Sequence, residues 1–333
     1  MDFDQAKTDW PKFVDYIDFK EEFIAEPKNI VHGLLDAGTQ LLFGGASKTF
    51  KTWLQLDLAL CICSGLSWLS FRTVAQPVIF VNCELSRYHI QKRLGEIAGA
   101  RNICLPRASF YLLNLRDFGD FERSKLVELL TDVCAKRGIK MVFLDPFYSL
   151  LSDLEDENRQ QDMRKALRNF RPLNKAEVAS SFGIHFSKGN QAAKEPEDRI
   201  GGAGTLVRYV DSVVTLTRHK VPGAFTIEFL CRNHAPLESF VIEWQHPVMG
   251  HRPDLDPKDL KKPGAKEDPY DIELLYEFIV DHDNEFDRKE LKDEVAPLLG
   301  WAERTVYLKI GKLLKANRVF ISKLTNKINV KPK

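Results

Sequence analysis

The chain has 333 residues, of which 44% are hydrophobic and 29% charged, and its formal net charge is +1. This apolar content excludes a disordered chain, and 19 glycines and 16 prolines without a repeat exclude a collagen-like or low-complexity protein. The length favours one large and one small domain. The near-zero net charge at first argues against a nucleic-acid partner.

The sequence does not suggest a membrane or export segment. The uncharged stretch at residues 58–71 is shorter than the roughly 18–20 apolar residues that a spanning helix needs. The acidic N-terminus lacks the basic and apolar regions of a secretory signal. The six cysteines lie mostly in apolar runs, without the spacing of a zinc site. We therefore expect a cytoplasmic protein with reduced, buried cysteines and no membrane contact.

Residues 1–27 carry six aromatic side chains and are interpreted as an N-terminal arm. From residue 28 to 249, short apolar runs alternate with helical patterns, which predicts an α/β fold with a mostly parallel sheet. The last two strands follow each other without a helix and should form an antiparallel hairpin. The predicted strands cover residues 40–43, 78–81, 141–144, 179–185, 212–216, 225–230 and 240–244. The predicted helices cover residues 52–63, 87–97, 121–136 and 158–170.

The remaining residues predict a second, smaller domain. Residues 250–269 are rich in proline, glycine and charge and are predicted to be a linker. Residues 270–333 then show three helical patterns, followed by short strands at 319–321 and 328–330. Three helices and a two-stranded wing are typical of a winged helix-turn-helix.

The most informative segment follows the predicted strand at 40–43. Lys51 and Thr52 begin a helix there, as in a P-loop, whose backbone N–H groups and helix N-terminus hold phosphates. Lys51 would neutralise the β- and γ-phosphates of ATP, and the Thr52 hydroxyl would bind Mg²⁺. The consensus fails where Phe50 replaces glycine, so a strand–turn–helix with a chance Lys-Thr pair is the alternative. The loop before Lys51 consists of Gly44, Gly45, Ala46, Ser47, Lys48, Thr49 and Phe50.

Three further strands end in side chains that suit nucleotide chemistry. Asp145 ends an apolar strand roughly 90 residues after the loop, the Walker B arrangement, in which a carboxylate orients Mg²⁺ or its bound water. Glu84 follows another strand and could activate the attacking water; alternatively, it is an acid near the start of the next helix. His185 ends a third strand and is interpreted as a γ-phosphate sensor, although a lone histidine is more often structural.

A polar segment, residues 189–199, precedes glycine-rich residues 200–204. Glycines there allow close backbone approach or hinge motion. Through Lys188 and Arg199 this region could face DNA in a central channel, or it could be an ordinary surface loop.

Taken in order, these motifs resemble the RecA-like ATPases of the RepA type, the replicative helicases of plasmids and phages, over residues 28 to 247. The resemblance implies a RecA-like P-loop NTPase core, ATP and Mg²⁺ as cofactors, and a ring of subunits, commonly a hexamer, with nucleotide sites between subunits. It also implies that Arg232 is an arginine finger for the neighbour's γ-phosphate; from the residues alone, Arg232 could be an ordinary edge-strand arginine. The resemblance rests on the loop Gly44–Thr52, then Asn82-Cys-Glu84, Phe143-Leu-Asp145-Pro, His185–Gln191, Asp198–Gly204, Tyr209-Val-Asp211 and Cys231–Pro236.

The overall neutrality conceals two opposite charges. Residues 301–333 hold nine basic residues and one acid, so this segment carries +8 and the first 300 residues carry −7. A winged helix with a basic third helix and wing is a candidate binder of DNA phosphates, whereas the alternative is a protein-interaction module with a solvated basic face. The candidate DNA contacts are Arg304, Tyr307, Lys309, Lys312, Lys323 and Lys327.

The leading hypothesis is therefore an ATP-dependent motor on DNA, most specifically a replicative helicase acting as a ring. Glu84, Lys51, Asp145, His185 and Arg232 would take part in hydrolysis. An ATP-switched DNA-binding accessory protein without helicase activity is the alternative. A phosphotransferase on a small substrate is a third reading, which the winged helix disfavours.

Overall fold

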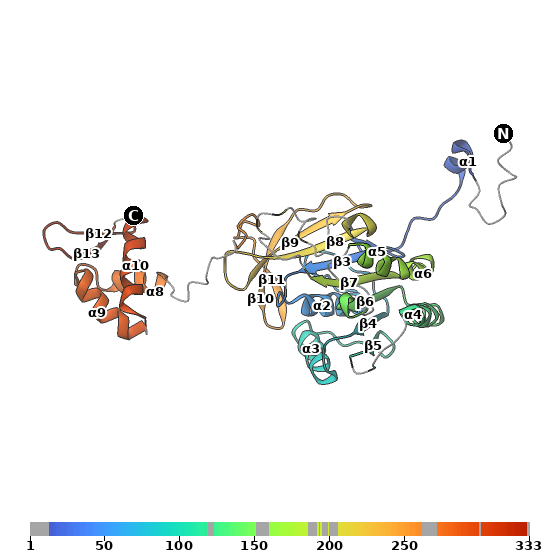
Figure 1. The fold of residues 1–333 in the computed structure, drawn as a ribbon, viewed down its shortest axis with the longest axis horizontal. Coiled ribbons are helices and arrows are strands. Elements are labelled where there is room, and N and C mark those ends of the chain that lie inside the picture. The colour runs from blue at the N-terminus through green and yellow to red at the C-terminus, as the bar shows by residue number, and fades with distance from the viewer. Residues whose placement is uncertain are drawn as a thin grey trace. The chain divides into compact units, whose positions relative to one another are not determined.

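The chain divides into two units, residues 1–263 and 264–333, and each is described by itself (Figure 1). The computed structural model describes residues 13–116, 118, 123–150, 160–185, 192, 194, 199, 206–261, 272–299 and 301–331. Within these ranges no helix is both long and apolar enough to cross a membrane.

Nine strands in the described part of the larger unit form one sheet, in the order β11-β10-β9-β8-β3-β7-β6-β4-β5. The six strands from β8 to β5 are parallel, as the strand–helix alternation predicts, and β9, β10 and β11 continue the sheet antiparallel. The strands are β3 (Gln40–Gly45), β4 (Val78–Asn82), β5 (Phe110–Asn114), β6 (Met141–Asp145), β7 (Ala179–His185), β8 (Ser212–Arg218), β9 (Ala224–Cys231), β10 (Phe240–Gln245) and β11 (Val248–His251).

Helices cover both faces of this sheet, which is why its central strands are apolar at nearly every position. Leu41 and Phe43 point to one face and pack in a core with α2 (Lys51–Ser64) and α3 (Arg87–Ala100). Leu42 points to the other face, whose core includes residues of α4 (Arg123–Arg137), α5 (Gln160–Asn169) and α6 (Arg171–Lys175). The period of two along β3 therefore divides one strand between two cores.

Several short elements complete the larger unit. Sequence analysis missed β5 and β11, and also the small sheet of β1 (Asn29–Val31) and β2 (Leu35–Asp36). Short 3₁₀ turns follow β6 at η2 (Phe147–Leu150) and precede β8 at η4 (Leu206–Tyr209). In the predicted arm, residues 13–28 are exposed, including the short helix α1 (Tyr16–Glu21).

The predicted linker begins too early. Residues 250–261 pack on the larger unit: the Thr226 hydroxyl donates to the carbonyl of Pro257 at 2.9 Å, and the Lys220 N–H donates to that of Asp259 at 2.8 Å. Leu260 forms a β-bridge with His219. This pairing satisfies backbone groups at the end of β8, so the proline-rich composition describes an ordered edge here.

The smaller unit has three helices, α8 (Ile272–Asp281), α9 (Arg288–Leu299) and α10 (Glu303–Lys315), then β12 (Val319–Ile321) paired antiparallel with β13 (Ile328–Val330). Val306, Ile310 and Leu313 on α10 are buried in its core, at the spacing of one helix face. The element order agrees with the predicted one, and the winged-helix assignment stays a prediction.

Candidate nucleotide-binding site

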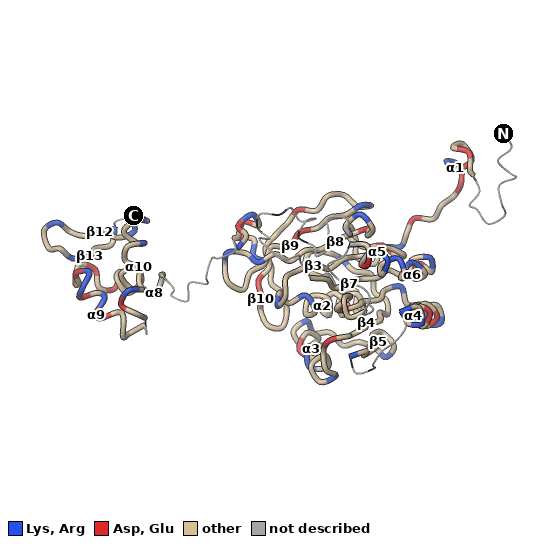
Figure 2. The backbone as a smooth tube through the Cα atoms, in the orientation of Figure 1, with Lys and Arg blue, Asp and Glu red and all other residues tan. Residues whose placement is uncertain are grey.

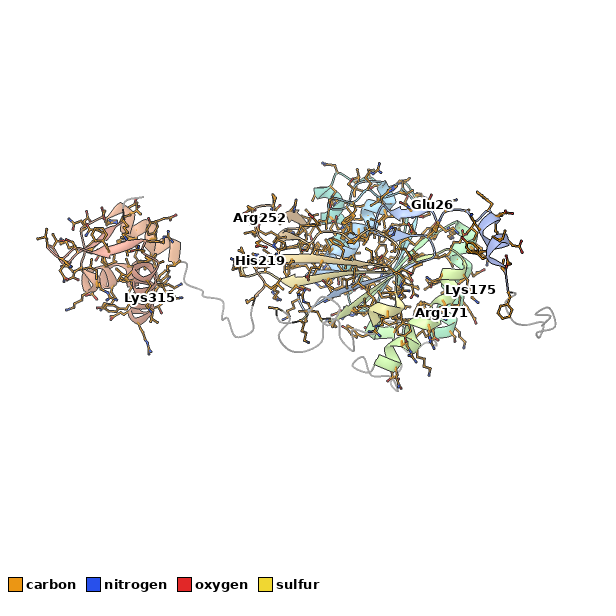
Figure 3. All side chains as sticks on the ribbon, turned by 90° about the horizontal axis from the view of Figure 1, so that it is seen from above. Glu26, Arg171, Lys175, His219, Arg252 and Lys315 are labelled. Carbon is orange, nitrogen blue, oxygen red and sulfur yellow. The ribbon has the colours of Figure 1, made fainter. Side chains whose placement is uncertain are left out.

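The parallel strands bring the predicted site residues to one edge of the sheet. Gly45 at the end of β3 pairs with His185 at the end of β7, and Asn82 at the end of β4 pairs with Asp145 at the end of β6. Figure 3 marks the two ends of the sheet, with His219 following β8 at the carboxyl end and Arg171 and Lys175 on α6 at the other. A cavity of about 390 Å³ opens at the carboxyl edge. It is lined by residues 47–53, Glu84, Leu85, Arg93, Asp145, Pro146 and His185.

Lys51 is the buried cation of this cavity. Its Nζ donates to the carbonyl oxygens of Gly45 at 3.0 Å and Ala46 at 2.8 Å, and it lies 3.5 Å from His185 Nδ1. Burial lowers the pKa of Lys51 to about 8, against the opposing effect of Asp145 and Glu84. The ammonium thus bonds to loop carbonyls that anionic phosphate oxygens could replace.

Asp145 and Thr52 lie together, as predicted for metal ligands. Asp145 is buried at the end of β6, and Gln55 Nε2 donates to its Oδ1 at 2.9 Å. Burial raises the pKa of Asp145, while hydrogen bonds from Thr52 and Gln55 oppose the rise. A hydroxyl and a carboxylate side by side are oxygen donors of the kind that Mg²⁺ prefers, so these residues fit the ion that a P-loop ATPase uses.

Gly183 makes room for this carboxylate, and sequence analysis missed it. A Cβ atom added there would overlap Asp145 Oδ1 and lie 2.8 Å from Gln55 Nε2. Two positions earlier on β7, the Ser181 hydroxyl donates to Gln55 Oε1 at 3.3 Å. A glycine inside an otherwise apolar strand was the signal available in the sequence, because it marks close approach of other atoms.

Glu84 and His185 also face the cavity. Glu84 is exposed and follows β4 in a turn that Asn82 fixes, since Asn82 bonds to Leu85 through both its amide nitrogen, at 2.7 Å, and its oxygen, at 3.0 Å. The His185 ring lies 5.0 Å from that of Tyr148. A carboxylate open to solvent at the cavity and an imidazole beside Lys51 suit the predicted roles of water activation and phosphate sensing.

An arginine and aromatic side chains form another part of the cavity wall. The guanidinium of Arg93, on α3, lies 4.8 Å from the ring centroid of Trp53. Trp53 in turn meets Trp244 edge-to-face at 5.2 Å. Arg93 had no motif to reveal it, because its place depends on how α3 packs on α2. Cations and aromatic faces beside a phosphate loop can hold a planar base.

Two further predicted residues are not among the described residues that line this cavity. Arg199 was predicted to contact DNA. Its side chain is 4% exposed, forms an ion pair with Glu228 and donates to the Thr217 hydroxyl at 3.1 Å, and its contact with DNA stays a prediction. Arg232 follows β9 near the start of β8, at the opposite end of the sheet, and donates to the carbonyl of Arg208. Its role in a neighbouring subunit stays a prediction. Lys188 lies outside the described residues.

The C-terminal candidates divide by exposure. Arg304, Tyr307, Lys312 and Lys323 are exposed, as surface contacts must be. Lys309 is 4% exposed and lies 6.0 Å from the ring centroid of Trp301, unlike a surface contact, and its contact with DNA stays a prediction. Lys327 is half-buried and donates to the carbonyl of Glu285 at 2.7 Å.

Comparison with known proteins gives one match. Residues 8–191, more than half of the chain, match the family model described as AAA domain. No match was found among curated proteins. The match and the site agree, since the matched segment contains the phosphate-binding loop, Glu84, Asp145 and His185. The chain therefore belongs to the AAA domain family, a family of P-loop ATPases.

Proposed function

We propose that this chain is an ATP-driven motor on DNA, a replicative helicase of the RepA type that works as a ring. The observation that carries the proposal is the convergence of five residues at one cavity: Lys51 and Thr52 begin α2 directly after the phosphate-binding loop, and Glu84, Asp145 and His185 lie at the ends of three parallel strands.

Each residue has a chemical task in ATP hydrolysis. Lys51 would exchange its bonds to Gly45 and Ala46 for phosphate oxygens, while the N-terminus of α2 supplies backbone N–H donors. Thr52 and Asp145 would hold Mg²⁺, which neutralises charge on the phosphates when it is bound. Glu84 would accept a proton from the attacking water, and His185 would register the γ-phosphate beside Lys51.

A ring would account for the position of Arg232. The described residues that line the cavity do not include Arg232, which is exposed at the other end of the sheet. In a head-to-tail ring each subunit presents such a surface to its neighbour, so an arginine there can complete the next site. The N-terminal segment 13–28, with its exposed aromatic side chains, would be a further contact between subunits.

Contact with DNA is supported by the smaller unit. Its last 33 residues carry +8, and its exposed cations include Arg304, Lys312 and Lys323. A winged helix with these side chains would bind the phosphate backbone of duplex or single-stranded DNA with little sequence preference.

The test is a comparison of ATP hydrolysis with and without single-stranded DNA, together with unwinding of a forked duplex. We expect hydrolysis stimulated by DNA and unwinding that Lys51→Ala abolishes. Particle mass measured with and without ATP and single-stranded DNA should reveal a ring. Hydrolysis without unwinding of any forked substrate would remove the helicase and leave the alternative, an ATP-switched DNA-binding accessory protein. A particle that stays monomeric would remove Arg232 as a finger.

A further inference from the structure

Two residues of the phosphate-binding loop have a backbone conformation that non-glycine residues avoid. Lys48 has φ 58° and Phe50 has φ 61°, both in the left-handed region. Phe50 is the residue directly before α2 and directly before Lys51. In this conformation Cβ crowds the following carbonyl oxygen, which is why glycine is the usual residue there. The loop therefore needs contacts that compensate for the missing glycine.

Phe50 has such contacts, all with the antiparallel part of the sheet. Its ring stacks on Trp244 of β10 with centroids 4.2 Å apart and planes 15° apart. It also meets Phe225 of β9 edge-to-face at 5.9 Å. Aromatic pairs at these separations are stabilising beyond their buried area. The ring that replaces glycine is thus held by contacts with two other aromatic rings.

A second contact holds the loop two residues earlier. Arg218, at the end of β8, donates through Nη2 to the carbonyl oxygens of Lys48 at 3.1 Å and Ser47 at 3.4 Å. Its guanidinium carbon lies 5.9 Å from the centroid of Phe225, its partner across the β8–β9 pair. Three adjacent strands therefore each contribute one side chain, Arg218, Phe225 and Trp244, to the outer side of the loop.

We propose that Trp244 is a positioning residue for nucleotide binding, which acts through Phe50. By stacking on Phe50, with Phe225 and Arg218 beside it, Trp244 holds the peptide before Lys51 in the conformation that a glycine would reach unaided. The phosphates are then bound by the loop, while Trp244 contributes through the geometry of Phe50. The inference rests on the proposed binding of ATP at this site.

The experiment measures binding of ATP and of inorganic tripolyphosphate to the full chain by calorimetry. Tripolyphosphate has no base, so it reports on the phosphate loop alone. The variants are Trp244→Ala, Trp244→Phe, Phe50→Gly and the double variant Phe50→Gly with Trp244→Ala, each checked for folding by circular dichroism. We expect Trp244→Ala to weaken the binding of both ligands about tenfold. This factor corresponds to the free-energy cost of holding a non-glycine residue in the left-handed conformation. Trp244→Phe, which can still stack, should stay within about threefold of the unaltered chain.

The decisive comparison is the effect of Trp244→Ala in the chain with Phe50 and in the Phe50→Gly variant. In Phe50→Gly the loop no longer needs the ring, so adding Trp244→Ala should change either Kd by less than about twofold. The same loss in both backgrounds would overturn the proposal. Weaker ATP binding with unchanged tripolyphosphate binding would also overturn the proposal, because Trp244 would then contribute to binding of the adenine base and not to the phosphate loop.

Two further results separate the possible failures. If Trp244→Ala does not fold, Phe50→Ala and Phe50→Gly replace it: the alanine lacks the ring and keeps the strain, so it should bind tripolyphosphate more weakly than the glycine variant. Equal binding by these two variants would overturn the proposal. An unaltered chain that binds neither ligand would instead remove the proposed ATP site, and the inference with it.

Discussion

Basic residues occur along both units of this chain (Figure 2), but those that the function is proposed to use differ in their burial. In the larger unit, Lys51 is 9% exposed and bonds to loop carbonyls, and Arg199 is paired with Glu228. In the smaller unit, Arg304, Lys312 and Lys323 are exposed. A buried cation interacts with one group at a fixed position, and burial disfavours its charged form because it loses hydration. Exposed cations contribute together to the attraction of phosphates, and salt screens this attraction. Charge alone therefore does not reveal which lysine performs chemistry.

The largest expected effect is a loss of ATP hydrolysis in the larger unit that leaves DNA binding by the smaller unit unchanged. Lys51→Ala should lower ATP hydrolysis on the order of 100-fold or more, because it removes the charge that faces the developing phosphate negative charge. DNA binding measured without nucleotide by fluorescence anisotropy should stay within about twofold, since the exposed cations remain. Loss of both activities together would mean that the two sets of cations are not independent.

The second effect tests whether the buried site depends on close packing. Gly183→Ala should displace the Asp145 carboxylate and lower hydrolysis on the order of 100-fold, as expected when a catalytic group moves by about 1 Å. Gly95→Ala is the matched control, because Gly95 is exposed on α3 and a Cβ there meets no atom beyond its own helix backbone and chain neighbours within 4 Å. It should leave hydrolysis unchanged and raise the free energy of unfolding by about 0.5–1 kcal/mol. Similar losses of hydrolysis in both variants would contradict the packing argument.

The third effect is a pH dependence of nucleotide binding. Lys51 has a pKa of about 8 in the free chain, so it is charged below that pH and becomes neutral above it. Phosphate binding needs the charged form, so affinity should be full at pH 7 and fall by up to about tenfold per pH unit above 8. Calorimetry from pH 7 to 9.5 measures this fall. Lys51→Arg, which stays charged, should flatten the profile, and an identical slope in that variant would assign the titration to another group.

The smallest effect distinguishes two lysines on one helix. Lys312→Ala should weaken DNA binding about two- to threefold and reduce the slope of log affinity against log salt by about one. Lys309→Ala should leave that slope unchanged and lower the free energy of unfolding by about 1 kcal/mol, because its buried stem packs beside Trp301. Anisotropy titrations at several salt concentrations and thermal denaturation measure the two quantities. Equal salt slopes in the two variants would show that exposure does not decide the role of these lysines.

Much of the site could be predicted because its residues end strands. An apolar run followed by Asp145, Glu84 or His185 needs only the rule that parallel strands share a carboxyl edge. Partners that depend on packing could not be found in this way. Gln55 reaches Asp145 across 90 positions of sequence, and Arg199 reaches Glu228 across 29.

Two features that the sequence analysis did not foresee had signals that were present in the sequence. Lys309 lies three residues after Val306 and four before Leu313, both buried, which places it beside the apolar stripe of α10. Residues 250–261 were assigned to a linker by composition, yet Val248 to His251 continue as β11 because they pair with β10. Composition describes the preference of a segment, and pairing with a strand of the sheet overrides it.

The ordered segment 252–261 has a mechanical consequence. Its last residue, Lys261, donates its backbone N–H to the carbonyl of Arg218 at 2.8 Å. The side chain of that same arginine donates to the carbonyls of Ser47 and Lys48 in the phosphate-binding loop. The last described residue of the larger unit is thus linked to the phosphate-binding loop through Arg218. A shift of Lys261 would therefore be passed by Arg218 to the carbonyls of Ser47 and Lys48.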